Sequence, residues 1–445
     1  MNLDEKAIAS INYYHQQAVS LLLYQSVFTG TIGRTFLSLL EALATSDKTA
    51  ALLRYGEWFS AIANQHTSWQ NYLLERILIA DNAFSQQSQT LLETNSSGQT
   101  DEPVAPHVKK AAAYDFSILQ DFYQLSPSQI SHWVSDLCDR SLPSIPTAAS
   151  TLPLSFIDTS DWATTAPPEL TRYYREHGVG IFGQFKAFRW QAEPTLGQAS
   201  GKLVGIATPD PIRLDQLVAY EHPKQQLIHN TQALLRGYTA QNVLLYGSRG
   251  AGKSSLVKAL LNEYGSRGLR LIEVPKADLH NLPNIVAPLS QTPQKFIIFV
   301  DDLSFEDDDE AFKALKVVLE GGVTARPQNV VVYATSNRRH LIREFFDERP
   351  RPKDADEIQA WDTVQEKLSF SDRFGLTLTF TPADQPTYLT IVRQLAQQAG
   401  LEIKTEHLEW RARQWATRHN GRSGRSARQF VDFLIAEQGN AQTDS

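Results

Sequence analysis

The chain has 445 residues, which at about 150 residues per domain predicts two or three folded units. A hydrophobic share of 42% with 10% aromatic residues is typical of folded proteins and excludes a mainly disordered chain. The 42 lysines and arginines against 49 acidic residues give a formal net charge of −7, which argues against a protein that coats nucleic acid with its whole surface.

The start of the chain and its cysteine content bear on its compartment. Cys138 is the single cysteine, so no intramolecular disulfide can form, which fits a reducing compartment. Asp4 and Glu5 stand where a secretory signal would be basic. The longest apolar runs, such as Ala18 to Tyr24, fall short of the ~20 residues that span a bilayer. We therefore expect a cytoplasmic protein without membrane attachment.

Residues 1–200 are predicted to be a mainly helical N-terminal region. Apolar residues recur there three and four positions apart, which is the period of an amphipathic helix. Ser126 or Ser128 is the expected N-cap inside the last of these stretches. The stretches cover residues 3–28, 50–64, 68–84 and 107–140.

Two linkers and a hydrophobic core are also expected in this region. Residues 86–106 are polar, residues 141–168 are rich in Pro, Ser and Thr, and both predict linkers. No catalytic constellation is present in this half. One stripe at helical spacing indicates a packed core and not a cofactor site; it consists of Trp69, Tyr72, Leu73 and Ile77.

Residues 201–381 predict an α/β core. Five short, near-continuous apolar runs alternate with helical segments, which favours a parallel sheet that is buried on both faces. The predicted strands are Val243 to Tyr246, Leu269 to Val274, Phe296 to Val300, Val330 to Ala334 and Leu376 to Phe380.

Residues 382–445 predict a small helical unit that follows the α/β core. Its three helices are expected over residues 385–398, 406–419 and 426–437.

A glycine-rich loop between the first of these strands and the next helix predicts a phosphate-binding site. Glycines let backbone N–H groups approach a triphosphate, and the helix N-terminus adds positive potential. We expect Lys253 to reach the β- and γ-phosphates and Ser254 to ligate Mg²⁺. The loop fits G-x-x-x-x-G-K-[ST] with Gly247, Ser248, Arg249, Gly250, Ala251, Gly252, Lys253 and Ser254, and Ser255 follows it.

Acidic residues follow the third predicted strand. Asp301 ends this strand beside the phosphate loop, where a carboxylate can hold Mg²⁺. Asp302 is the candidate for polarising the attacking water. Because its side chain is shorter than the glutamate often found in such sites, Glu306 is a rival base.

A polar amide follows the fourth predicted strand. Asn337 would lie next to the acid-bearing strand, where it could orient the lytic water near the γ-phosphate. The alternative for Asn337 alone is a turn residue at a strand end, but the two preceding motifs favour the functional interpretation.

Together these motifs resemble the AAA+ ATPases, which combine Walker A, Walker B, a sensor-1 asparagine and a helical lid. The resemblance is closest to a bacterial family of uncharacterised AAA+ ATP-binding proteins and covers about residues 217–438. It is carried by Asn230-Thr231, by Asp-Asp-Leu-Ser-Phe-Glu at 301–306, by Ala-Thr-Ser-Asn-Arg-Arg-His at 334–340 and by Ser-Asp-Arg-Phe-Gly at 371–375.

The resemblance implies a P-loop NTPase fold with five parallel strands in the order 5-1-4-3-2, ATP between core and lid, and assembly of several copies. It implies an arginine finger at Arg373, with an ion pair to Asp372 as the alternative. Arg425 matches the sensor-2 position, with Arg428 as the alternative. Val218 and Tyr220 lie where this fold lines the adenine pocket.

The expected function is that of an Mg-ATP-dependent ATPase that remodels or loads a protein partner recruited by the N-terminal region. Two alternatives stay open: a nucleic-acid-associated ATPase of the helicase-loader or transposition-helper type, favoured by the basic lid, and a nucleotide-gated scaffold with little hydrolysis. The segment from Arg343 to Lys367 is a candidate partner-binding loop.

Overall fold

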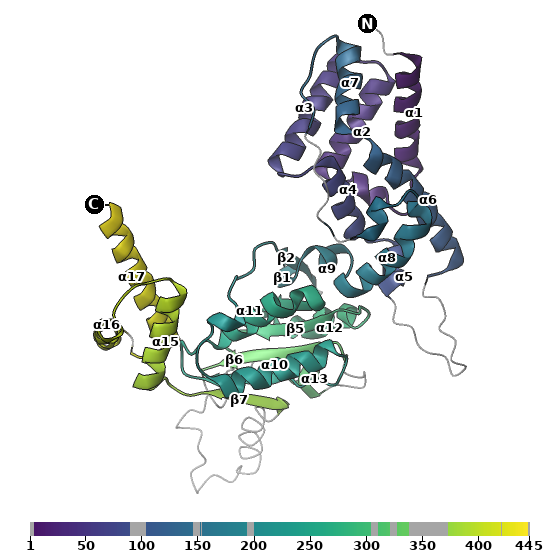
Figure 1. The fold of residues 1–445 in the computed structure, drawn as a ribbon. Coiled ribbons are helices and arrows are strands. Elements are labelled where there is room, and N and C mark those ends of the chain that lie inside the picture. The colour runs from purple at the N-terminus through teal and green to yellow at the C-terminus, as the bar shows by residue number, and fades with distance from the viewer. Residues whose placement is uncertain are drawn as a thin grey trace. The chain divides into compact units, whose positions relative to one another are not determined.

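The computed structural model describes residues 4–89, 104–145, 152, 154–193, 200–303, 310–320, 327–337, 373–419 and 421–443 (Figure 1). The chain divides into two units, Met1–Gln184 and Phe185–Ser445. Within the described residues, no helix combines the length and the hydropathy that a membrane span requires. The candidate partner-binding loop at 343–367 and the rival base Glu306 lie outside these ranges.

The described part of the first unit is mainly helical, and side chains cap the start of several helices. Asp4 accepts a hydrogen bond from the Ala7 N–H at 2.6 Å, and Asp47 and Ser68 cap later helices in the same way. Of the two predicted caps near residue 127, Ser126 is the one that precedes the helix. The helices are α1 (Glu5–Ser20), α2 (Thr31–Ala44), α3 (Lys48–Asn64), α4 (Trp69–Leu78), α5 (Ala83–Gln89), α6 (Pro106–Gln124), α7 (Pro127–Cys138), α8 (Trp162–His177) and α9 (Gly180–Gln184).

The aromatic stripe of α4 lies in the core of this unit, as the sequence predicted. Trp69, Tyr72, Leu73 and Ile77 are all buried. The rings of Phe36 and Trp69 lie 4.2 Å apart between centroids, so aromatic side chains of α2 and α4 meet in this core.

The sequence predicted a linker over residues 141–168, but the structure has a helix at the C-terminal end of this segment. There α8 begins at Trp162, capped by Asp161, although Pro167 and Pro168 fall inside it. Each proline removes a helical hydrogen bond, but Trp162 is buried in the core and holds the first turn in place.

The second unit contains one seven-stranded sheet in the order β2-β1-β4-β5-β6-β3-β7. Five adjacent parallel strands of this sheet, β4, β5, β6, β3 and β7, are the predicted ones, and their arrangement confirms the order 5-1-4-3-2 and the P-loop α/β fold class. The strands are β1 (Ala187–Glu193), β2 (Ser200–Ile206), β3 (Val243–Gly247), β4 (Leu269–Glu273), β5 (Lys295–Val300), β6 (Val330–Ser336) and β7 (Leu376–Phe380).

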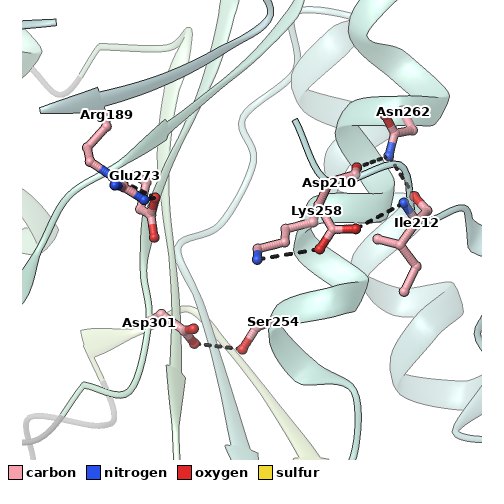
Figure 2. A network of polar contacts seen from close by, with 8 residues as sticks. All are labelled: Arg189, Asp210, Ile212, Ser254, Lys258, Asn262, Glu273 and Asp301. Carbon is pink, nitrogen blue, oxygen red and sulfur yellow. Dashed lines mark hydrogen bonds and ion pairs between the residues drawn. The ribbon is translucent and has the colours of Figure 1, made fainter. Parts of the chain in front are cut away.

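The hairpin of β1 and β2 extends the sheet beyond the predicted strands. β1 pairs in parallel with β4, and β2 pairs antiparallel with β1. Arg189 of β1 stands opposite Glu273 of β4, and the two form an ion pair at 2.7 Å (Figure 2). The sheet therefore includes residues that precede position 201.

Two helices pack on one face of the sheet. Leu227 and Leu234 of α10 (Glu221–Leu235) and Leu256 and Leu260 of α11 (Lys253–Tyr264) share a buried cluster with strand residues of β3 to β7. Within the described residues, the core also contains α12 (Leu282–Leu289) and α13 (Glu310–Glu320).

Asn230 and Thr231, which belong to the family resemblance, have a structural place in this packing. The amide of Asn230 and the hydroxyl of Thr231 lie 3.0 and 2.9 Å from the buried Tyr333 hydroxyl of β6. Asn230 also accepts a hydrogen bond from the Gln241 N–H and donates one to its carbonyl, both at 2.9 Å. The pair thus fixes α10 to the strands that support the phosphate loop.

Three helices after β7 form the predicted helical unit, here called the lid. They are α15 (Gln385–Gln398), α16 (Thr405–Arg418) and α17 (Gly424–Thr443) (Figure 1). The lid has its own buried cluster, which includes Tyr388, Val392, Ala412 and Phe430.

Candidate nucleotide-binding site

The loop from Gly247 to Ser254 joins β3 to α11, as predicted, and its glycines have left-handed backbones. The φ angles are 140° at Gly247, 75° at Gly250 and 85° at Gly252. A Cβ at Gly247 would lie 2.0 Å from the Phe380 carbonyl oxygen of β7. Glycine is therefore required where the loop leaves the sheet.

A cavity of about 780 Å³ opens above this loop. Six cationic side chains and two carboxylates line it, which suits a polyanionic ligand. The predicted residues among its lining are Val218, Tyr220, Arg249, Gly250, Ala251, Gly252, Lys253, Ser254, Ser255, Asp301, Asp302, Asn337, Arg425 and Arg428.

Lys253 is buried at the start of α11, with its ammonium group inside the site. Its Nζ donates to the carbonyl oxygens of Gly247 and Ser248 at 2.9 and 2.8 Å and to Asn337 Oδ1 at 3.2 Å. Burial lowers the pKa of Lys253, and the charges of Asp301 and Asp302 oppose this shift. The predicted residues Gly247 and Ser248 thus contribute to the site through their carbonyl oxygens, which accept hydrogen bonds from Lys253.

The hydroxyl of Ser254 and the carboxylate of Asp301 meet at the mouth of the loop. Ser254 Oγ donates to Asp301 Oδ1 at 2.6 Å (Figure 2). Hydroxyl and carboxylate oxygens are ligands that Mg²⁺ prefers, usually beside waters and phosphate oxygens. The described residues hold no cluster of three or more His, Cys, Asp or Glu, so a metal ion here would need ligands from the nucleotide and from water.

Asp302 and Asn337 lie together at the ends of β5 and β6. Asn337 Nδ2 donates to Asp302 Oδ1 at 2.7 Å, while Asn337 Oδ1 accepts from Lys253. Asp302 has a left-handed backbone, with φ 52°. One asparagine thus connects the lysine of the phosphate loop to the candidate water-activating acid.

The apolar end of the cavity combines residues from three parts of the second unit. Ala219 and Tyr220 have φ angles of 72° and 59°, and the Tyr220 ring lies 5.2 Å from the Phe380 ring. The Tyr220 hydroxyl donates to the Thr381 carbonyl at 2.7 Å. The apolar lining that sequence reasoning missed consists of Ile212, Leu217, Leu256, Phe380, Ile391 and Leu395.

Contacts with α11 hold the chain segment that carries Ile212. Asn262 Nδ2 donates to the carbonyls of Asp210 and Ile212 at 2.8 and 2.6 Å (Figure 2). The Asp210 carboxylate pairs with Lys258 at 3.6 Å. The same helix therefore supports the phosphate loop at its start and the apolar wall along its length.

The arginines of the predicted site divide into two groups. Arg425 and Arg428 of α17 line the cavity, and the Arg425 N–H donates to the Gly250 carbonyl at 3.2 Å. Arg373, just before β7, is not among the described residues that line the cavity. Its predicted alternative partner Asp372 lies outside the described ranges.

A protein-family model described as "Protein of unknown function (DUF815)" matches residues 183–438. Solved structures similar to this chain include the Thermotoga maritima RuvB Holliday junction branch migration motor, at 15% identity, 52% coverage of this chain, 67% of that chain and a TM-score of 0.35. A mutant of the same RuvB has 17% identity, 52% and 68% coverage and a TM-score of 0.37. No curated protein matches the chain. The fold assignment accordingly rests on the sheet order and the loop.

Proposed function

The chain belongs to the DUF815 family of proteins of unknown function, and we propose that it binds ATP together with Mg²⁺ and hydrolyses it. One observation carries the proposal: Lys253, Ser254, Asp301 and Asn337 converge on a single cavity behind a loop whose glycines need left-handed backbones. A triphosphate supplies the charge that the cationic lining matches, and the apolar wall near Tyr220 suits a base.

Each polar group has a distinct role in this proposal. Lys253 and the N-terminus of α11 bind phosphate oxygens, while Ser254 and Asp301 hold Mg²⁺, which offsets phosphate charge. Asp302 orients and deprotonates the attacking water, and Asn337 fixes the Asp302 carboxylate through its bond at 2.7 Å.

We place hydrolysis at an interface between copies of the chain. Arg373 is absent from the described lining of its own cavity, which fits a guanidinium that acts on the γ-phosphate of a neighbour. A finger of this kind raises the rate about 10³–10⁵-fold in GTPases. The work driven by hydrolysis is the remodelling or loading of a protein client, which the helices of the first unit recruit.

The arginines of the lid support a nucleic-acid-associated ATPase less than they support the proposed ATPase, because several of them already have a place within the chain. Arg411 pairs with Glu437 at 2.6 Å, and Arg425 and Arg428 face the cavity. A function on DNA predicts binding that weakens steeply with salt, because phosphate contacts release counterions.

The proposal is tested by the affinity for a fluorescent ATP analogue in the presence of Mg²⁺. Lys253→Ala should lower the affinity at least about 100-fold, since it removes charged hydrogen bonds worth about 1.5–3 kcal/mol each. The control is Lys202→Ala, because Lys202 pairs with Glu193 in the β1–β2 hairpin. Equal affinity of both variants and the wild type would refute the proposal, and binding without turnover would leave only a nucleotide-gated scaffold.

A further inference from the structure

Thr335 lies near the end of β6, between the strand that leads to Asp301 and the strand that leads to the phosphate loop. It pairs in register with Leu245 of β3, and its neighbour Ala334 pairs with Val300 of β5. Its side chain is 2% exposed, and it lines the nucleotide cavity. A hydroxyl is therefore buried between the two halves of the candidate site.

This hydroxyl bridges the two acids. Thr335 Oγ1 donates to Asp301 Oδ1, the oxygen that also accepts from Ser254. The same Thr335 Oγ1 accepts from the Asp302 N–H at 3.0 Å. One hydroxyl thus satisfies the side chain of the first acid and the backbone of the second.

The backbone of Thr335 holds the same turn. Its carbonyl accepts from the Leu303 N–H at 2.7 Å. The two N–H groups that Thr335 binds, those of Asp302 and Leu303, flank the Cα of Asp302. Asp302 has a left-handed φ of 52°, which costs free energy and persists because its surroundings hold it. From this conformation its carboxylate accepts the bond from Asn337.

We infer that Thr335 is a positioning residue that sets the metal-side carboxylate of Asp301 and the water-activating carboxylate of Asp302 relative to one another. The inference rests on the proposed function and deepens it. Loss of the hydroxyl leaves Asp301 with one donor fewer and the Asp302 N–H without its acceptor. The phosphate loop and Lys253 do not bond to this hydroxyl, so nucleotide binding without metal stays intact.

The test compares Thr335→Val, which has nearly the same shape, with Thr335→Ser, which keeps the hydroxyl. The matched control is Ser336→Ala, because the buried Ser336 hydroxyl donates to the Leu303 carbonyl of the same turn at 2.8 Å. Three quantities are measured in the full-length protein: ATP affinity in EDTA, Mn²⁺ affinity in the presence of ATP by electron paramagnetic resonance, and kcat against KM for Mg-ATP.

Thr335→Val is expected to weaken Mn²⁺ binding and lower kcat, each about tenfold or more, because a hydrogen bond to a charged group is worth about 1.5–3 kcal/mol. ATP affinity in EDTA stays within about twofold of the wild type, a margin of less than 0.5 kcal/mol. Thr335→Ser restores metal affinity and kcat, and Ser336→Ala keeps both.

Wild-type metal affinity and kcat in Thr335→Val would overturn the inference, as would equal losses in Thr335→Val and Thr335→Ser. An equal loss of ATP affinity in EDTA would show a merely structural role and overturn it too. If Thr335→Val does not fold, Thr335→Ser is compared with Thr335→Ala, and equal metal affinity overturns the inference. A wild type that binds no nucleotide refutes the proposed function itself.

Discussion

Lys253 carries a charge that its surroundings only partly support. Burial lowers its pKa from the ordinary 10.5, although Asp301 and Asp302 favour the charged form. Bound phosphate would raise the pKa again, because it brings negative charge to the ammonium group. At a pH between the Lys253 pKa of the free protein and that of the ATP complex, ATP binding takes up a proton. The affinity for ATP therefore falls as the pH rises through this range.

Proton uptake at Lys253 is measured by calorimetry of ATP binding in buffers that differ in ionisation enthalpy. We expect the apparent enthalpy of ATP binding to depend on the buffer at alkaline pH, with the sign that proton uptake gives. Uptake that Lys253→Arg leaves unchanged would contradict the assignment, because arginine stays charged throughout this range.

Asp302 and Glu306 compete for the role of base, and the structure describes only the first. Asp302 is held in the site by the hydrogen bond that it accepts from Asn337. We predict that Asp302→Asn keeps the affinity for ATP and lowers kcat about 10²–10⁴-fold, as expected for the loss of a general base. Single-turnover hydrolysis of radiolabelled ATP measures the change. A loss of this size in Glu306→Gln, with near wild-type turnover in Asp302→Asn, would transfer the role to Glu306.

At the scale of elements, Asp115 of α6 holds the chain directly after α1. Its buried carboxylate accepts from the N–H groups of Leu22, Leu23 and Tyr24, at 2.9, 2.7 and 2.9 Å for the shortest contact of each. In Asp115→Asn an amide NH₂ faces one of these N–H groups. We predict a loss of about 2–4 kcal/mol in the free energy of unfolding.

Urea unfolding followed by tryptophan fluorescence measures this loss, with Asp121→Asn as the control on the same helix. The Asp121 carboxylate accepts a hydrogen bond from the Tyr13 hydroxyl at 2.6 Å in an exposed place, so its change should cost less than about 1 kcal/mol. Equal stabilities of the two variants would contradict the role given to Asp115.

The elements that the sequence predicted are those with uninterrupted patterns. Strands such as Phe296 to Val300 are buried on both faces and read as apolar runs. Strand β1 (Ala187–Glu193) was missed because it lies toward the edge of the sheet and has no continuous apolar run. The exposed Arg189 interrupts its buried residues, and its last three residues are exposed. The start of α8 was missed because Pro167 and Pro168 suggest a linker, whereas core packing of Trp162 decides the outcome.

The candidate site could be predicted where the type and spacing of its residues indicate a single function. The spacing of Gly247, Gly252 and Lys253 indicates a phosphate loop without tertiary information. Thr335 belongs to the 334–340 run of the family resemblance, but nothing in the sequence indicated its role, because threonine in a strand is ordinary. Ile212 gave no signal either, because isoleucine before a helix is ordinary. Their roles depend on the sheet order and on the contact between Asn262 and the Ile212 carbonyl.

At the scale of the whole molecule, an interface site predicts complementation between two inactive variants. Arg373→Ala keeps its own cavity but lacks the finger, and Lys253→Ala keeps the finger but lacks nucleotide. Because each supplies what the other lacks, a mixture should regain part of the ATPase activity that neither has alone. Phosphate release from mixtures at constant total concentration measures this effect, and activity that stays at the level of the separate variants would argue against a shared site.

The proposed function depends on the loop from Gly247 to Ser254, which we expect to bind the β- and γ-phosphates of ATP. The most direct measurement is a calorimetric titration of the wild-type protein with ATP, ADP and AMP in the presence of Mg²⁺. We predict that ATP and ADP bind at least about 100-fold more tightly than AMP, since charged hydrogen bonds to the outer phosphates contribute about 1.5–3 kcal/mol each. Equal affinities for ATP and AMP, or no binding of any of the three, would contradict the claim.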